Sequence, residues 1–342
     1  MMSRFTAGLR AIALAAAALL VTVRLCAADS VQSLYEGAKK EGKVVLWSAL
    51  DVSLHQKIAA KFNEKFPGIA VEAFKMFPGP AIERLITESK AGRVNVDIID
   101  PNVAFLPPLF ERGLAAAYPY DRVFGIDPSR LLFDKRTIAI GHYDIPITYN
   151  TSLVAPGAIH SYDDLLDRKY QGKLLVEAHA YALAILGAKW GDRKILDFIN
   201  KLLANRPIII NSPTATAEAL AAGQGAAAIG AYAARVSLFK DQGAPVDWAR
   251  VGPIPSQTVV SVPINGSPHP NAAKLYAAFW ATREAQEIFY REQRHGMLTG
   301  PDRNARGAEI EKRGLEVVFE PTDIAKSRHL LEMTSRALGG IK

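Results

Sequence analysis

The sequence is nearly devoid of cysteine. Its one cysteine, Cys26, lies within the first 28 residues. If those residues are a leader that is removed, the mature chain has neither a disulfide framework nor a thiol nucleophile. The apolar content of 49% and the charged content of 22% are ordinary for a globular protein. We therefore expect a large hydrophobic core to supply the stability.

Long apolar runs are also scarce. One run extends from Ala11 to Val23, after two arginines and before Cys26-Ala27-Ala28. This order is typical of a secretory signal peptide, so we expect residues 1–28 to be removed by cleavage near Ala28. The run is shorter than the roughly 20 residues of a spanning helix, which disfavours a one-pass anchor. Leu25 disfavours lipid attachment at Cys26, because that processing site requires a small residue there.

No basic tract stands out, although the formal net charge is +7. Part of that charge belongs to the leader, which carries Arg4, Arg10 and Arg24 and no acid. The remaining Lys and Arg residues are spread among acids and do not alternate with aromatics. The sequence therefore predicts no nucleic-acid partner.

Common catalytic motifs are missing as well. Neither G-x-S-x-G nor H-E-x-x-H occurs, and no two histidines have the i, i+4 spacing of a helical zinc site. The segment from Ser237 to Lys240 matches S-x-x-K, but it lacks the elements that accompany this motif in penicillin-binding enzymes, so we interpret it as a helix surface. His179 directly follows a predicted strand and is either a loop residue or a ligand contact. We predict neither a cofactor nor an enzymatic activity.

One glycine-rich segment lacks the context of a cofactor-binding loop. Gly223-Gln224-Gly225 begins a G-x-G-x-x-A pattern that resembles a dinucleotide-binding loop. That loop requires a strand before the glycines and a helix after them, whereas here the predicted order is the reverse. We interpret Gly223 as the C-cap of the preceding helix.

Strands and helices alternate through the rest of the chain. Three strands are expected at Lys43–Trp47, Ile69–Phe74 and Val96–Asp100, with helices between them. A second set has strands at 174–176, 208–210 and 226–230. The fold class is therefore α/β with two lobes, each a mostly parallel sheet flanked by helices.

Two extended segments divide these sets. Asp144–Asn150 leads to the turn Ala155-Pro156-Gly157, and Val259–Pro263 follows the second set. We expect lobe 1 to begin with residues 29–147 and lobe 2 to comprise 148–258. Residues 259–342 would form the return crossover and the C-terminal part of lobe 1.

The candidate binding residues lie beyond the carboxyl ends of the expected strands. Ligands of open α/β sheets bind at that edge, where loops and helix N-termini converge. A helix is predicted to begin near Pro213, and its first turn could bind an anion. Arg235 could bind a carboxylate, or could instead pair with an acid on a helix surface. The predicted ligand-binding residues are Ser48, Asp51, Tyr149, Ser212, Thr214, Tyr232 and Arg235.

Short motifs in the family's order resemble the extracellular solute-binding proteins of the iron(III), thiamine, polyamine and phosphonate type. They include Val44–Leu50, Phe66-Pro67-Gly68, Tyr149-Asn150, Asp163–Asp167 and Pro268–Leu275. The resemblance implies a type II periplasmic-binding fold and a periplasmic location. It also implies that the chain captures a small solute and delivers it to the permease and ATPase of an ABC importer. We expect the chain to act as a monomer.

The cargo is left open between an organic anion and iron. Iron-binding members use two adjacent tyrosines and often a histidine in the first loop. Tyr232 matches the first tyrosine but Ala233 follows it, and Asp51 stands near the histidine position. We expect an organic anion and no metal; if iron is bound, Tyr232 and Asp51 would be its ligands. Two functions besides import compete with this hypothesis, namely an exported enzyme and a sensor that presents its ligand to a membrane signalling protein.

Overall fold

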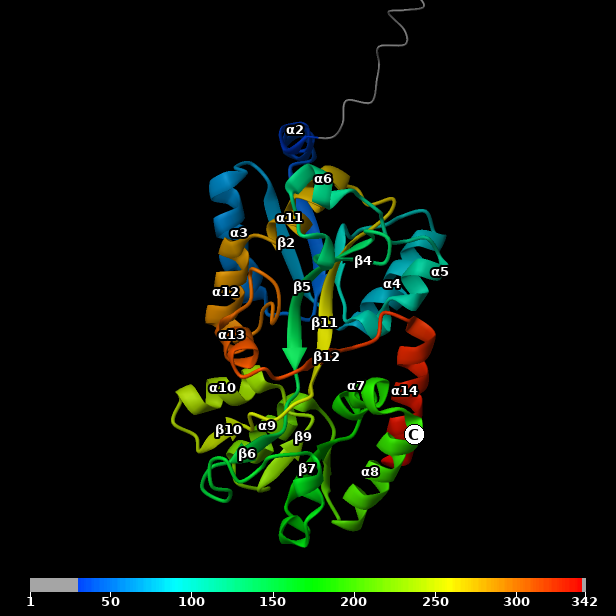
Figure 1. Ribbon diagram of the computed structural model, residues 1–342. Coiled ribbons are helices and arrows are strands. Elements are labelled where there is room, and N and C mark those ends of the chain that lie inside the picture. Colours follow the sequence, from blue (N-terminus) through cyan, green and yellow to red (C-terminus); the bar gives the residue numbers. More distant parts are fainter. Residues whose placement is uncertain (1–29, 340–342) are drawn as a thin grey trace, which may run out of the picture.

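The structure, a computed structural model, describes residues 30–339. It has two lobes, each built on one β-sheet with helices packed against it (Figure 1). The strand order is β2-β1-β3-β11-β5-β4 in lobe 1, with β12 beside β11, and β10-β6-β9-β7-β8 in lobe 2. The two-lobed α/β fold class is therefore confirmed.

The strands of lobe 1 are β1 (Lys43–Ser48), β2 (Ala70–Lys75), β3 (Ile98–Asp100), β4 (Leu131–Leu132), β5 (Thr137–Asp144), β11 (Ile254–Pro263) and β12 (Val317–Phe319). Those of lobe 2 are β6 (Thr148–Asn150), β7 (Leu174–Glu177), β8 (Ile208–Ile210), β9 (Ala227–Ile229) and β10 (Val246–Trp248).

The helices of lobe 1 are α2 (Val31–Glu41), α3 (Val52–Lys65), α4 (Pro78–Lys90), α5 (Pro107–Glu111), α6 (Tyr120–Phe124), α11 (Pro270–Phe279), α12 (Arg283–Gln293) and α13 (Ala305–Lys312). Those packed in lobe 2 are α7 (Tyr181–Trp190), α8 (Asp192–Ala204), α9 (Pro213–Ala221), α10 (Ala233–Asp241) and α14 (Ile324–Ala337).

Both sheets are mixed, not mostly parallel as expected. In lobe 1, β11 is antiparallel to β3 and β5 and parallel to β12; in lobe 2, β6 is antiparallel to β9 and β10. The cause is the path of the chain. A strand that enters a lobe from the crossing runs opposite to the strands that lead toward the crossing.

The crossings are short. The first is the three-residue link between β5 and β6, and the second, residues 249–253, joins β10 to β11 (Figure 1). The expected return segment, Val259–Pro263, instead lies inside the lobe 1 sheet, where Val259 is paired with Gly141 and Val262 with Ile99. These residues are part of a ten-residue buried strand that already begins at Ile254.

The last helix also differs from expectation, because α14 packs on α7 and α8 of lobe 2 (Figure 1). Leu338, which follows α14, belongs to the core of that lobe. The Leu330 side chain of α14 packs against Gly187 of α7, where an added Cβ atom would lie 3.1 Å from Cδ2 of Leu330. The chain thus crosses between the lobes a third time, after β12. The apolar face of α14 draws it there, since burial of that face against lobe 2 is favourable.

Candidate functional site

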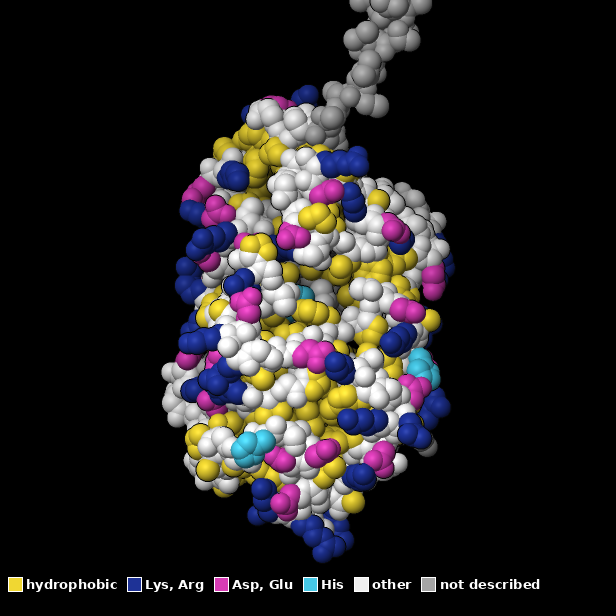
Figure 2. Space-filling view, viewed as in Figure 1, with side chains coloured by type: hydrophobic (Ala, Val, Ile, Leu, Met, Phe, Trp, Pro, Cys, Tyr) yellow, Lys and Arg dark blue, Asp and Glu magenta, His cyan; other side chains and the backbone are white. Residues whose placement is uncertain are grey.

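Strands of both lobes run toward the crossings, so their carboxyl ends lie at the space between the lobes. They include β1, β3 and β5 of lobe 1 and β7 and β9 of lobe 2, as the pairing directions show. Figure 2 shows a hollow across the molecule at this level. Side chains at these strand ends are therefore the first candidates for binding a solute.

Three aromatic rings from both lobes meet here. Tyr143 near the end of β5 lies with its ring centroid 5.1 Å from that of Tyr232, the N-cap residue of α10. His295, after α12, lies 4.2 Å from Tyr143 and 6.0 Å from Tyr232, again between centroids. We call these residues the ring cluster. It joins lobe 1, which supplies two rings, to lobe 2, which supplies one.

The polar groups of the ring cluster are mostly neutral. The Tyr232 hydroxyl donates to Oε1 of Gln257 at 3.0 Å, and burial raises the pKa of this phenol well above its ordinary value. Burial also lowers the pKa of His295 to about 3, with Arg306 and Arg235 adding to the effect. The Nδ1 atom of His295 is buried without a hydrogen-bond partner among the described residues. A neutral imidazole therefore offers an unused polar atom.

Arg235 lies one turn after Tyr232 on α10, and its charge acts on His295. Its side chain is exposed and makes no hydrogen bond or ion pair with a described residue. The structure thus brings the two predicted residues Tyr232 and Arg235 together beside the ring cluster. An unpaired guanidinium there can bind a carboxylate or phosphate with two parallel hydrogen bonds.

Ser48 and Asp51 lie at the opposite wall, in lobe 1. Ser48 ends β1, and its buried hydroxyl accepts the Leu50 N–H at 3.2 Å. Asp51 precedes α3 and is already engaged, because it pairs with Lys75 Nζ at 2.6 Å and accepts from Gln293 Nε2 at 3.1 Å. The Lys75 ammonium thus offsets the negative charge of Asp51, whose side chain is still 55% exposed.

Asp100 ends β3, at the strand edge where the sequence places the candidate lining of the site, although it was not singled out as a ligand-binding residue. Its side chain is 3% exposed, and neither carboxyl oxygen makes a hydrogen bond to a described residue. Burial raises the pKa of Asp100 to about 7, although the nearby hydroxyls of Ser261 and Ser48 oppose the rise. The carboxyl is therefore largely protonated below neutral pH.

Asp100→Asn is expected to change how stability depends on pH. The native pKa of Asp100 is raised, so its contribution is present at low pH and is lost as pH rises through about 7. Asn has no such loss. The loss begins above the unfolded pKa of about 4, so between pH 4 and pH 8 the unfolding free energy of the variant should rise relative to wild type by about 1–4 kcal/mol, at about 1.4 kcal/mol per pKa unit. Urea unfolding at both pH values measures this, and an equal difference at the two would contradict it.

The expected α9 N-terminus is present. The helix begins at Pro213, and the Ser212 hydroxyl accepts the Ala215 N–H at 3.1 Å, so this hydroxyl caps the helix. Thr214 in the first turn is partly exposed. No contact given by the structure joins either residue to the ring cluster, and their roles in binding stay predictions.

Tyr149 lies elsewhere. It sits opposite Asp247 in β6, and its side chain lines a surface cavity of about 510 Å³ with Trp248 and Arg250. The interpretation of its strand end as part of the cleft was wrong. Because β6 enters lobe 2 from the crossing, its carboxyl end points away from the space between the lobes.

A tight loop after β7 adds polar groups that lie near Tyr232. The buried Glu177 carboxylate accepts the backbone N–H of His179 at 2.8 Å and lies 2.6 Å from the Nδ1 atom of that residue. The rings of His179 and Tyr181 are stacked with centroids 5.4 Å apart. The Glu177 charge reaches Tyr232, where it helps to raise the phenol pKa. His179 is thus a partner of Glu177 in a loop that faces the site.

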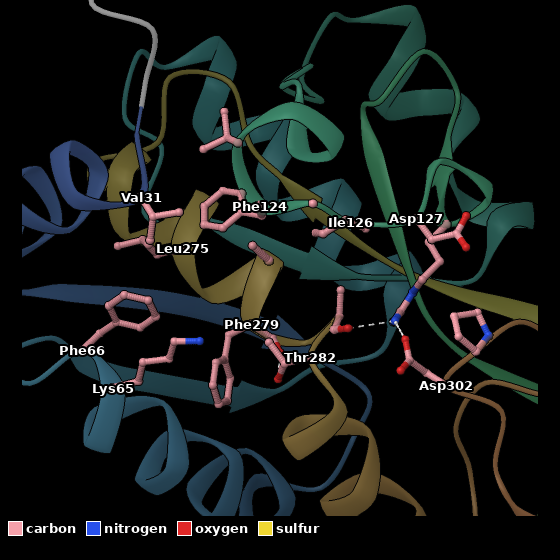
Figure 3. A pocket seen from close by; sticks show the side chains of 16 residues that line it. Val31, Lys65, Phe66, Phe124, Ile126, Asp127, Leu275, Phe279, Thr282 and Asp302 are labelled. Atoms are coloured by element: carbon pink, nitrogen blue, oxygen red, sulfur yellow. Dashed lines mark hydrogen bonds and ion pairs between the residues drawn. The ribbon is translucent and has the colours of Figure 1, made fainter.

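Lobe 1 has a separate cavity of about 370 Å³ that is remote from the ring cluster (Figure 3). Phe66, Phe124 and Phe279 form much of its wall. Arg130 at one end donates to the Ala281 carbonyl at 2.9 Å and pairs with Asp302 at 3.2 Å. This arginine is fully engaged, so it is not available to a ligand.

Within residues 30–339, no group of three or more His, Cys, Asp and Glu side chains is placed to hold a metal ion. A membrane-spanning helix is likewise not found in that range. The expected cleavage near Ala28 and Cys26 itself lie outside the described residues.

Comparison with solved structures supports the fold. An ABC transporter substrate-binding protein from Agrobacterium tumefaciens has a TM-score of 0.71 at 15% identity, covering 86% of this chain and 94% of that one. Iron-bound HitA from Pseudomonas aeruginosa has a TM-score of 0.71 at 18% identity, covering 87% and 99%. AfuA from Actinobacillus pleuropneumoniae, with fructose-6-phosphate bound, has a TM-score of 0.66 at 18% identity, covering 87% and 99%.

No curated protein sequence matches the chain. A family model does match, over residues 57–300, and its description is bacterial extracellular solute-binding protein. The matched residues include parts of both lobes, the first two crossings and the ring cluster. This chain is a member of the bacterial extracellular solute-binding protein family.

Proposed function

We propose that the chain is the periplasmic substrate-binding component of an ABC importer and that its cargo is a small organic anion. It would bind this cargo between the lobes as a monomer and release it unchanged to the permease. Family membership supports the solute-binding role. The observation that carries the choice of cargo is the unpaired cation Arg235 beside the ring cluster.

The surroundings of Arg235 suit an anion with a small apolar part. The guanidinium supplies the charge, while Tyr143 and Tyr232 supply ring surface from both lobes. Among the described residues, the carboxylates that act on Tyr232 are Glu177, which His179 already engages, and Glu320, whose pKa burial raises to about 7. Uncompensated negative charge near the site is therefore small, and a bound anion would meet little repulsion.

Arg235→Ala is expected to weaken cargo binding by about ten- to a hundredfold, because a charge-assisted hydrogen bond is worth about 1.5–3 kcal/mol. The cargo is first identified by native mass spectrometry of protein from its own periplasm, and affinity is then measured by calorimetry. The matched control is Arg193→Ala, at an exposed arginine of α8 whose side chain has no hydrogen bond or ion pair with a described residue. An unchanged affinity of Arg235→Ala, or a cationic cargo, would rule the proposal out.

Ferric iron or an iron chelate is the second candidate, since Tyr143 and Tyr232 face each other with centroids 5.1 Å apart. Two phenolates could thus come from different lobes in place of two adjacent tyrosines. Against this, both phenol pKa values are raised by burial, and Asp51 is engaged by Lys75. The organic anion is therefore the better-supported cargo.

Titration with ferric citrate is expected to produce no strong visible absorption from tyrosinate bound to iron, because too few anionic oxygens surround the two phenols. The same titration of Tyr232→Phe and Tyr143→Phe provides the control. A coloured complex in wild type that both variants lose would favour iron as the cargo.

A further inference from the structure

A third cavity lies at the end of lobe 2 that faces away from the crossings. It has a volume of about 550 Å³ and is enclosed by residues 153–158 after β6, residues 169–173 before β7 and residues 223–226 before β9. We call it the distal cavity. Since β7 and β9 run toward the crossings, loops at their amino ends lie at the opposite edge from the ring cluster. Its volume falls in the range of about 300–1,000 Å³ that is usual for small-molecule sites.

The loops around the distal cavity are held in place by hydrogen bonds. The Val154 N–H donates to the Asn150 carbonyl at 2.9 Å, and the Asn150 side chain donates to the Leu220 carbonyl at 3.1 Å. The Ala226 N–H donates to the Lys173 carbonyl at 2.7 Å. A cavity braced in this way is formed before a ligand arrives, so binding requires little ordering of the loops.

The glycine-rich segment forms one wall of the distal cavity. A Cβ atom on Gly225 would lie 2.6 Å from Cγ of Leu175, so this loop can press against β7 only with glycine there. Gly223 has φ +74°, a conformation that favours glycine at the end of α9. The Gly-Gln-Gly sequence therefore shapes the cavity, in a setting unlike a dinucleotide loop.

The walls of the distal cavity are apolar, and its charges are of one sign. Leu153, an unusually exposed leucine at 57%, lines it together with Val154 and alanines. The Lys173 side chain makes no hydrogen bond or ion pair with a described residue. The Nζ atom of Lys169 lies 3.8 Å from Oδ2 of Asp167, but both side chains are more than half exposed, so this ion pair is weak. None of the described residues that line the cavity is acidic.

We propose that the distal cavity binds a small organic anion with an apolar body, such as an aromatic carboxylate, independently of the site between the lobes. Lys173 would pair with the carboxylate and Lys169 would add to the positive field. The apolar body would lie against Leu153 and the neighbouring alanines. This proposal does not depend on the cargo of the main site, because the two sites share no residues.

The test uses 2-naphthoate as the probe, with binding to the full mature chain measured by calorimetry. We expect saturable binding that Lys173→Glu weakens by about tenfold or more, because a charge-assisted contact becomes a repulsive one. Leu153→Asp should weaken it similarly. Lys201→Glu, at an exposed lysine of α8 paired with Asp197, makes the same charge change outside the cavity and should leave affinity within about twofold.

Two further measurements identify where the probe binds and what supplies the negative charge. Arg235→Ala should leave naphthoate binding intact; loss of binding in this variant but not in Lys173→Glu would place the probe between the lobes and overturn the proposal. Vesicles of anionic phospholipid test a membrane surface as the source of negative charge. Binding to vesicles that depends on Lys173, without binding of free naphthoate, would also overturn it. A matched melting temperature for each variant and wild type shows that the fold is kept.

Discussion

Replacing Arg306 by methionine should destabilise the protein by about 3–5 kcal/mol, the usual loss when one partner of a buried ion pair is removed. Arg306 is 5% exposed and Asp144 is 1% exposed. The Nη1 atom of Arg306 donates to both carboxylate oxygens of Asp144, at 2.8 and 3.0 Å. Its Nη2 atom donates to the Ser237 hydroxyl in lobe 2 and to the Arg294 carbonyl in lobe 1, both at 3.2 Å. The variant leaves the Asp144 charge buried and unpaired beside the first crossing.

Urea unfolding measures this loss. Arg303→Met, at a more exposed arginine paired with Glu311, is the control and should cost less than about 1 kcal/mol. The double variant Arg306→Met/Asp144→Leu should recover much of the loss, because no charge is then left buried. Similar losses in Arg306→Met and Arg303→Met would mean that the buried pair is not what stabilises this region.

Gly230→Ala should also cost about 3 kcal/mol or more, from backbone strain and overpacking together. Gly230 has φ +111°, and a Cβ atom there would lie 2.2 Å from Cβ of Glu177. Glu177 sits in β7, next to β9, so neither backbone can move away without breaking the sheet. Because Tyr232 follows two residues later, the same change should displace the start of α10.

Gly243→Ala is the matched control for Gly230→Ala. Gly243 has φ +91° but nothing within 4 Å of an added Cβ atom, so only backbone strain should remain, at about 1 kcal/mol. Unfolding in urea compares the two variants. If both variants lose the same unfolding free energy, the contact between an added Cβ atom at position 230 and Glu177 adds no destabilisation, which would contradict the prediction.

Local signals in the sequence predicted much of this structure. The apolar run from Lys43 became β1, and Ser212 followed by Pro213 marked the start of α9. Tyr232 and Arg235 were identified because a strand is followed there by a helix, and a spacing of three residues places both near the start of α10. Such signals act over a few residues, so the sequence alone is enough to detect them.

The direction of β6 was not visible in the same way. The alternation of residues around Tyr149 indicates a strand but does not say whether it runs toward the crossings or away from them. Similarly, the spacing of apolar residues in α14 indicates that one face of the helix is buried, but it does not indicate which lobe that face packs against. Both answers depend on pairings between distant segments.

The ring cluster was missed for a related reason. Tyr143 is an ordinary strand residue in the sequence, and His295 follows a helix with no motif around it. Their importance arises only because β5 and the turn after α12 meet: the His142 N–H donates to the Gly296 carbonyl at 3.0 Å. The position of Asp100 at a strand end could be inferred from the sequence. The burial of its carboxyl beside Ser48 and Ser261 could not, since these neighbours are far apart in the chain.

The third crossing affects the order in which the molecule can fold as it is made. Lobe 1 needs β11, which is synthesised after all the strands of lobe 2, and lobe 2 needs α14, close to the end of the chain. Neither lobe is complete until almost the whole polypeptide is available. In a chain still emerging from the ribosome, the apolar surfaces of both lobes would lack the segments that cover them. Such a chain stays unfolded and is suited to passage through a narrow export channel.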